Sequence, residues 1–331
     1  MEKMIEIVMS GGNILIVSHI NPDGDAVGSV TAMSGFLSSH GVSSTIILPC
    51  EYPSYLSFLD EEGKIIIYGK ERKRADALIA EADLIVVLDL NRLDRLERMA
   101  KAVKASPARK VLIDHHPQPE TDIFEHLVSN VELSSTCEIL FWLFRSTGER
   151  FPVNIAQSLY VGMITDTNNF SNSVLSSTFR MAAELLDMGV DKEKLQHLVF
   201  GDFSEDRMRL MGNMLRDKMV VLPEYRAAYM VLSLEDQRKY NFKDGDSEGF
   251  VNMPLNIKDI DVSALFTEKR DHIRVSMRSR SEFSVNEFTK RYFDGGGHEK
   301  AAGGTLVISL DKVSGYFEDK IKTYCEDIYH E

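Results

Sequence analysis

The chain has 331 residues, of which 44% are hydrophobic and 27% are charged, and its formal net charge is −13. This length exceeds the size at which a single hydrophobic core usually stops growing, so we expect two domains. The negative charge argues against a protein that coats long duplex nucleic acid, because such binding neutralises many phosphates. A short anionic ligand held in a local basic pocket remains compatible with it.

The cysteines and the apolar runs indicate the cellular compartment in which the protein is expected to function. Cys50, Cys137 and Cys325 are few, odd in number and far apart in the chain, which supports neither a disulfide framework nor a cysteine-based zinc site. The chain opens without the pattern of a signal peptide, and no apolar run approaches membrane-spanning length. We therefore expect a cytoplasmic protein that has no membrane partner.

The first half of the chain alternates between strand-like and helix-like segments. Short apolar runs predict strands at 14–18, 45–48, 84–90 and 110–113. Helical patterns are expected at 26–40, 94–104, 135–146 and 155–165, with Gly41 ending the first of them. Repeated strand–helix order predicts an α/β domain with a parallel sheet and right-handed crossovers.

The pattern changes beyond residue 191. Residues 193–221 are predicted to be mainly helical. Strands are then expected at 226–232, 262–268, 273–278 and 305–308, with a helix at 285–293. We predict a catalytic domain at 1–190, a helical linker at 191–221 and a smaller α+β domain at 222–331.

Imidazole and carboxylate side chains follow several of the predicted strands. They are His19, Asp23 and Asp25 after the first strand, Asp89 at the end of the third, Asp114, His115 and His116 after the fourth, and Asp166 between two threonines. Ligands of parallel α/β sheets bind beyond the carboxyl ends of the strands, so we expect these groups to converge at one edge.

Such a set is sufficient for two divalent metal ions, which need a shared ligand and roughly three further protein ligands each. Mixed imidazole and carboxylate ligation suits manganese and also iron, zinc or cobalt, whereas calcium and magnesium prefer oxygen ligands. A single aspartate after a strand is usually a helix cap or a turn former. Two dense clusters with two further aspartates favour a metal site, which in turn indicates hydrolysis at phosphorus.

Four ordered segments resemble the motifs of the DHH phosphoesterase superfamily: 19–29 (HINPDGDAVGS), 87–89 (VLD), 114–116 (DHH) and 162–166 (GMITD). The segment 295–304 (GGGHEKAAGG) resembles the hallmark of its accessory DHHA1 domain. The resemblance covers essentially the whole chain, and within the superfamily its length and two-domain layout are most similar to the bacterial nano-RNase and pAp phosphatase group. It implies a five-stranded type of parallel sheet flanked by helices, followed by a smaller domain with a mixed sheet.

The resemblance also implies roles for individual residues. One ion would be held by His19, Asp23 and Asp89, and the other by Asp25, Asp89, His115 and Asp166, so that Asp89 bridges the two. His116 would face the substrate as a catalytic group, with Asp114 supporting it. The stretch Asn168-Asn169-Phe170 departs from the family, which often has a glycine and a basic residue there.

The second domain carries features of an anion site. Gly295, Gly296 and Gly297 offer unhindered amides, and His298 follows them. The window 269–300 contains eight Lys or Arg against five Asp or Glu, a net +3 within an acidic chain. Arg278 resembles the arginine of the DHHA1 pattern and is expected to bind phosphate, whereas Arg270, Arg280 and Lys290 fit a solvated basic face.

The sequence therefore predicts a manganese-dependent phosphoesterase with two divalent ions, which hydrolyses RNA of two to five nucleotides, pAp to AMP, or both. A phosphodiesterase for linear or cyclic dinucleotides such as pApA or c-di-AMP is an alternative. An inorganic pyrophosphatase or polyphosphatase is a second alternative, and a catalytically silent nucleotide sensor is a third. The sequence does not specify the exonuclease polarity, the base preference, the native metal or the oligomeric state.

Overall fold

The computed structural model describes residues 2–201, 203–243 and 245–329. The chain divides into two compact units, Met1–Asp202 (unit 1) and Phe203–Glu331 (unit 2). None of the helices within the described ranges has the length and apolar character that crossing a bilayer requires.

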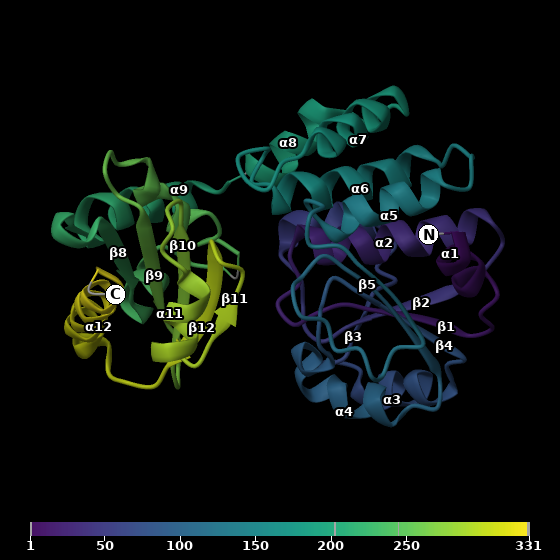
Figure 1. Ribbon diagram of the computed structural model, residues 1–331, viewed down its shortest axis with the longest axis horizontal. Helices are drawn as coiled ribbons and strands as arrows, with labels where there is room; N and C mark the ends of the chain where they lie inside the picture. Colours follow the sequence, from purple (N-terminus) through teal and green to yellow (C-terminus); the bar gives the residue numbers. More distant parts are fainter. Residues whose placement is uncertain (1, 202, 244, 330–331) are drawn as a thin grey trace. The chain divides into compact units, whose positions relative to one another are not determined.

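Unit 1 is built on a sheet whose neighbouring strands all run parallel, in the order β3-β2-β1-β4-β5-β6 (Figure 1). The strands are β1 (Ile14–Val17), β2 (Ser44–Leu48), β3 (Ile66–Ile67), β4 (Leu84–Leu88), β5 (Arg109–Asp114) and β6 (His126–Ser129). The sheet has one strand more than the five expected. The short β6 lacks the continuous apolar run that marks the predicted strands, and β3 lies in the apolar run 65–68, which is not among the predicted strands.

Helices cover both faces of this sheet, with α2, α5 and α6 on one face and α3 and α4 on the other (Figure 1). Successive β1 side chains therefore enter different cores: Ile14 and Ile16 pack with α2, α5 and α6, while Leu15 and Val17 pack with α3 and α4. The helices of unit 1 are α1 (Glu2–Met9), α2 (Gly24–Ser39), α3 (Arg72–Glu81), α4 (Ala100–Ala105), α5 (Thr136–Arg145), α6 (Val153–Asp166), α7 (Ser176–Asp187) and α8 (Lys192–Phe200).

Most expected helices of unit 1 are present, with one clear difference. α2 begins at the N-cap Asp23 and ends before Gly41, whose φ is +75°. The helix expected at 94–104 is instead a 3₁₀ segment, η2 (Leu93–Met99), followed by α4. A positive φ of +47° at Glu97, within η2, interrupts the helical backbone ahead of α4.

Unit 2 contains a mixed sheet in the order β11-β12-β10-β9-β8-β7, in which only β8 and β9 pair in parallel. The strands are β7 (Met219–Leu222), β8 (Ala227–Leu232), β9 (Val262–Glu268), β10 (Ile273–Ser279), β11 (Gly296–Gly297) and β12 (Ala301–Leu306). The helices are α9 (Glu205–Asn213), α10 (Leu234–Lys239), α11 (Val285–Tyr292) and α12 (Val313–Tyr329).

Two segments of unit 2 differ from the sequence expectation. The helical pattern expected up to residue 221 ends in a π-helical turn, η3 (Met214–Lys218), and the chain then forms β7. The last strand begins at Ala301 rather than at residue 305, because the small residues 301–304 pair with β10. Glycine-rich stretches weaken the strand signal in a sequence, but here they allow close backbone packing.

Candidate metal centre

The parallel sheet of unit 1 has a topological switch point between β1 and β4. From β1 the chain adds β2 and then β3 on one side of the sheet, and from β4 it adds β5 and then β6 on the other side. Sheets with this strand order bind ligands beyond the carboxyl ends of the strands at that point. His19 follows β1 and Asp89 follows β4, so the switch point carries an imidazole and a carboxylate.

His19, Asp23 and Asp89 form one group of potential ligands. The Nε2 atom of His19 lies 3.3 Å from Asp89 Oδ2 and 3.9 Å from Asp23 Oδ1. Its Nδ1 lies 2.7 Å from the carbonyl oxygen of Ile20, and donation to that oxygen leaves the Nε2 lone pair facing the carboxylates. Nitrogen and oxygen lone pairs that face one another need a proton or a metal ion between them.

Asp25, Asp89 and His115 form a second group. The Nε2 atom of His115 lies 3.7 Å from Asp89 Oδ1, 4.0 Å from Asp25 Oδ2 and 3.3 Å from Asp166 Oδ2. Ligands that bind one ion at about 2.0–2.2 Å are at most about 4.4 Å apart, and every one of these separations satisfies that limit. The residues therefore fit a divalent ion at each group.

Asp89 belongs to both groups. Its Oδ2 faces His19 and its Oδ1 faces His115, as a carboxylate that joins two ions requires. Asp89 also adopts a left-handed φ of +59°, which is uncommon for a residue other than glycine. Strain of this kind concentrates at functional sites, where the surrounding structure holds it in place.

The burial of these carboxylates shifts their pKa values. Burial, reinforced by the neighbouring Asp89 charge, raises the pKa of Asp25 well above its ordinary value. Burial also raises the pKa of Asp89, against the opposing hydrogen bond with His19. For His115, burial lowers the pKa, but the charges of Asp166, Asp89 and Asp25 outweigh it and raise the pKa to about 9. The site thus has an excess of negative charge that a bound cation would offset.

We expect metal binding to release protons. Below a pH of about 9 the metal-free protein carries a proton on His115, which must leave before the nitrogen can bind a metal ion. The apparent affinity for Mn²⁺ should therefore rise as the pH increases from 6.5 towards 9 and level off above that pH. Calorimetric titrations at pH 7.5 in buffers of different ionisation enthalpy measure the number of protons released. A value of zero would contradict the charge state assigned to His115.

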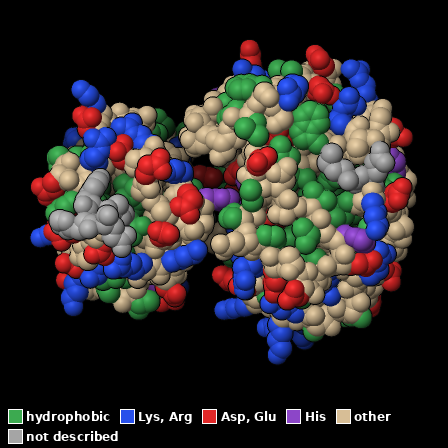
Figure 2. Space-filling model, in the orientation of Figure 1, with side chains coloured by type: hydrophobic (Ala, Val, Ile, Leu, Met, Phe, Trp, Pro, Cys, Tyr) green, Lys and Arg blue, Asp and Glu red, His purple; other side chains and the backbone are tan. Residues whose placement is uncertain are grey.

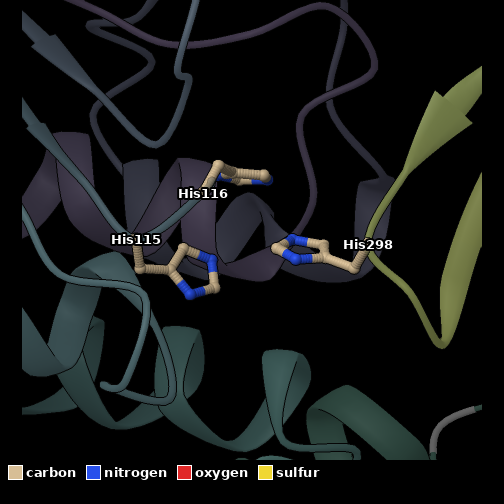
Figure 3. Close-up of side chains that lie close together, drawn as sticks. All are labelled: His115, His116 and His298. Atoms are coloured by element: carbon tan, nitrogen blue, oxygen red, sulfur yellow. The ribbon is translucent and has the colours of Figure 1, made fainter. Parts of the chain in front are cut away.

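His116 occupies a different position from His115, although both follow β5 (Figure 3). Its Nδ1 lies 2.8 Å from Asp114 Oδ1, and its backbone N–H donates to Asp114 Oδ2 at 3.1 Å. Asp114 is fully buried, and burial raises its pKa to about 6. Asp114 thereby fixes the orientation of the imidazole through Nδ1.

Two features of this site escape sequence reasoning. The backbone amides of Thr136 and Cys137, at the start of α5, donate to the two oxygens of Asp25 at 2.7 and 2.9 Å. Gly162 on α6 faces the same carboxylate, since a Cβ there would lie 2.7 Å from Asp25 Oδ1 and 2.2 Å from the Cys137 sulfur. Ser135 is the N-cap of α5, and its side chain accepts a hydrogen bond from the Glu138 N–H.

The residues expected to bind substrate lie in unit 2. Arg278 lies on β10 and its Nη1 donates to the Met277 carbonyl oxygen at 2.9 Å, while His298 follows β11 (Figure 3). Two backbone amides of this segment have partners within unit 2. The Gly297 N–H donates to Asn286 Oδ1 at 3.1 Å, and the His298 N–H donates to the Ala301 carbonyl oxygen at 2.8 Å.

Close backbone packing explains why these positions are glycine. A Cβ on Gly295 would lie 2.0 Å from the Gly303 carbonyl oxygen, and one on Gly304 would lie 2.5 Å from the Phe293 carbonyl oxygen. Close approach of the backbone therefore requires glycine at both of these positions. The side chains of Arg278 and His298 remain the stronger candidates for an anion contact in unit 2.

Comparisons with known proteins agree with this architecture. Residues 13–163 match the DHH family N-terminal domain, and residues 225–323 match the DHHA1 domain. The bifunctional oligoribonuclease and PAP phosphatase NrnA of Bacillus subtilis is 24% identical over 329 residues, which cover 98% of each chain. A membrane protein–ribosomal subunit bL9 fusion protein of Onion yellows phytoplasma is 25% identical over 318 residues. This chain spans 36% of the length of that fusion protein.

A solved structure is similar to this protein over nearly the full length of both chains. It is an exopolyphosphatase-related protein from Bacteroides fragilis, with a TM-score of 0.92 and 37% sequence identity, and the match covers 97% of this chain and 95% of that one. Both matched domains, their order and this similarity lead to one assignment. The chain belongs to the DHH phosphoesterase family and carries a C-terminal DHHA1 domain.

Proposed function

We propose that the protein uses two divalent ions, preferably Mn²⁺, to hydrolyse short oligoribonucleotides to mononucleotides, pAp to AMP, or both. The observation that carries this proposal is Asp89, whose two oxygens face separate groups of imidazole and carboxylate ligands at the switch point of the sheet. The relative named as an oligoribonuclease and PAP phosphatase supports the substrate class, since it matches the chain end to end.

In this proposal His19, Asp23 and Asp89 hold one ion, and Asp25, Asp89, His115 and Asp166 hold the other. Bound divalent ions supply Lewis acidity that polarises the phosphoryl group and activates a water molecule as the nucleophile. Asp89 fixes the spacing of the two ligand groups. Asp114 holds the His116 imidazole through Nδ1, and the protonated ring would donate a proton from Nε2 to the leaving oxygen of the substrate.

The charge distribution fits short substrates better than long ones. On the face drawn in Figure 2, acidic and basic side chains are interspersed over both units. The whole chain carries a net charge of −13, which disfavours a long polyanion at physiological salt. A short nucleotide with a few phosphates needs only a local cationic group, which Arg278 offers in unit 2.

We expect Arg278→Gln and His298→Ala to raise KM for a dinucleotide about 10- to 100-fold, the loss expected for one hydrogen bond to a charged group. The affinity for Mn²⁺ should stay unchanged, because neither residue belongs to the proposed ligand set. Arg274→Gln is a matched control, since Arg274 lies on the same strand as Arg278 and is exposed. Loss of Mn²⁺ binding in the Arg278 or His298 variant would show that the metal and substrate roles have been assigned to the wrong residues.

A polyphosphatase is the second candidate, because the similar solved structure is named as exopolyphosphatase-related. A substrate panel with Mn²⁺-loaded protein separates the two candidates. It comprises pAp, pApA, RNA of two to five nucleotides, cyclic dinucleotides, pyrophosphate, polyphosphate and long duplex DNA. We expect mononucleotide release from the short RNAs, AMP formation from pAp, or both, with no cleavage of duplex DNA. Cleavage of pyrophosphate or polyphosphate alone would overturn the proposed substrate class.

A further inference from the structure

The first residue of α5 contacts two of the proposed metal ligands at once. Thr136 is fully buried, its backbone N–H donates to Asp25 Oδ2 at 2.7 Å, and its hydroxyl donates to Asp89 Oδ1 at 3.0 Å. Cys137 completes the contact by donating its N–H to Asp25 Oδ1 at 2.9 Å. The start of one helix thus holds a carboxylate from α2 and another from the end of β4.

These hydrogen bonds constrain the directions in which the carboxylates present their remaining lone pairs. Each oxygen of Asp25 accepts one amide, which leaves the carboxylate fixed in rotation. The Thr136 hydroxyl has a single proton, and donation to Asp89 Oδ1 leaves Oδ2 of that residue directed at His19, 3.3 Å away. The amides at a helix N-terminus also favour a nearby negative charge.

Glu138 holds this segment in place from within the core. Its side chain is fully buried, and Oε2 accepts hydrogen bonds from the Ser134 N–H at 3.0 Å, the Ser134 hydroxyl at 2.6 Å and the Thr178 hydroxyl at 2.9 Å. Burial raises the pKa of Glu138, but the hydrogen bonds, that of Ser134 foremost, outweigh it and lower the pKa. An ionised Glu138 therefore ties the loop before α5 to α7.

We propose that Thr136 is a positioning residue that orients the carboxylates of Asp89 and Asp25 for metal binding. Glu138 supports it by holding the loop that precedes α5. The proposal rests on the proposed function only in requiring that Asp25 and Asp89 bind divalent ions. Residues that orient metal ligands in this way change metal affinity about 10- to 100-fold when they are replaced. A purely structural role for the Thr136 hydroxyl would instead affect folding and leave metal affinity unchanged.

The test compares two substitutions at the same position. Thr136→Val keeps the shape and the backbone N–H but removes the hydroxyl, and Thr136→Ser keeps the hydroxyl. We expect Thr136→Val to weaken Mn²⁺ binding about 10- to 100-fold and Thr136→Ser to retain wild-type affinity. Isothermal titration with MnCl₂ and equilibrium dialysis measure the affinity and the number of ions without reference to activity.

Thr31→Val is the matched control. Thr31 lies on α2, and its hydroxyl donates to the Val27 carbonyl oxygen at 2.8 Å and lies 3.0 Å from the Ser158 hydroxyl. The variant therefore loses a comparable hydroxyl in the same unit, away from the ligands, and should bind Mn²⁺ as the wild type does. Circular dichroism in EDTA shows whether Thr136→Val is folded. If it is not, Glu138→Gln provides a second test of the proposal. It should also weaken Mn²⁺ binding, since it removes the charge that holds Ser134.

Two results would overturn the proposal: wild-type Mn²⁺ affinity in a folded Thr136→Val protein, or equal losses in the valine and serine variants. If the valine variant is unfolded, wild-type Mn²⁺ affinity in Glu138→Gln would overturn the proposal. A wild-type protein that binds Mn²⁺ but cleaves no phosphoester contradicts the proposed function and leaves the result for Thr136 standing. A wild-type protein that binds no Mn²⁺ contradicts both.

Discussion

Asp89→Asn is expected to lower kcat at least about 10³-fold and to remove more than one equivalent of bound Mn²⁺. The substitution keeps the shape of the side chain and an acceptor for the Thr136 hydroxyl, which donates to Asp89 at 3.0 Å. It removes the charge that both ligand groups share. Metal content by atomic emission and steady-state kinetics on a dinucleotide measure the two effects.

Asp83→Asn is the control for this experiment. Asp83 directly precedes β4, at the strand end opposite Asp89, and its Oδ2 accepts the Asn13 N–H at 2.8 Å. An asparagine can accept the same hydrogen bond, so metal content and turnover should remain at wild-type levels. An Asp89→Asn protein that retains both ions and a normal rate would show that Asp89 is not shared.

The second large effect concerns His116. We expect His116→Ala to lower kcat about 10²- to 10⁴-fold on nucleotide substrates, the range for loss of a general acid. Mn²⁺ content should remain unchanged. A p-nitrophenyl phosphodiester has a leaving group that needs no proton, so its hydrolysis should fall far less. This difference between the two substrates is specific to proton donation and is measured by steady-state kinetics.

His126→Ala serves as the control, because His126 lies on β6 and is partly exposed, with Glu125 3.6 Å away. This variant should hydrolyse both substrates at the wild-type rate. If His116→Ala slowed the two substrates equally, the residue would act on the phosphoryl group rather than on the leaving oxygen. Loss of Mn²⁺ from the same variant would place it among the metal ligands.

Much of the fold and of the candidate site can be predicted from the sequence, because buried parallel strands form short runs of apolar residues that are easy to recognise. The runs that form β1 and β4 are apolar throughout, since both faces of the sheet are covered, and the first two residues after each run lie at the switch point. His19 and Asp89 therefore follow from pattern and topology alone. The grouping of Asp23 with His19 and of Asp25 with His115 follows from the family resemblance, and the distances in the structure agree with it.

Other features depend on contacts between distant residues, which one sequence does not reveal. The hydrogen bonds from Thr136 reach Asp25 and Asp89, 111 and 47 positions away. The left-handed backbone of Asp89 has no sequence signal, since glycine or asparagine would normally mark it. In unit 2, the sequence likewise does not reveal that a Cβ at Gly295 or Gly297 would clash with the backbone of β12.

The central claim is that one carboxylate, Asp89, joins two divalent ions. The measurement that tests it most directly is anomalous diffraction from crystals of the full chain grown with MnCl₂, recorded at the manganese absorption edge. We predict two anomalous peaks, one beside each oxygen of Asp89, with His19 and Asp23 at the first and Asp25, His115 and Asp166 at the second. A single peak, or peaks that Asp89 does not contact, would contradict the account.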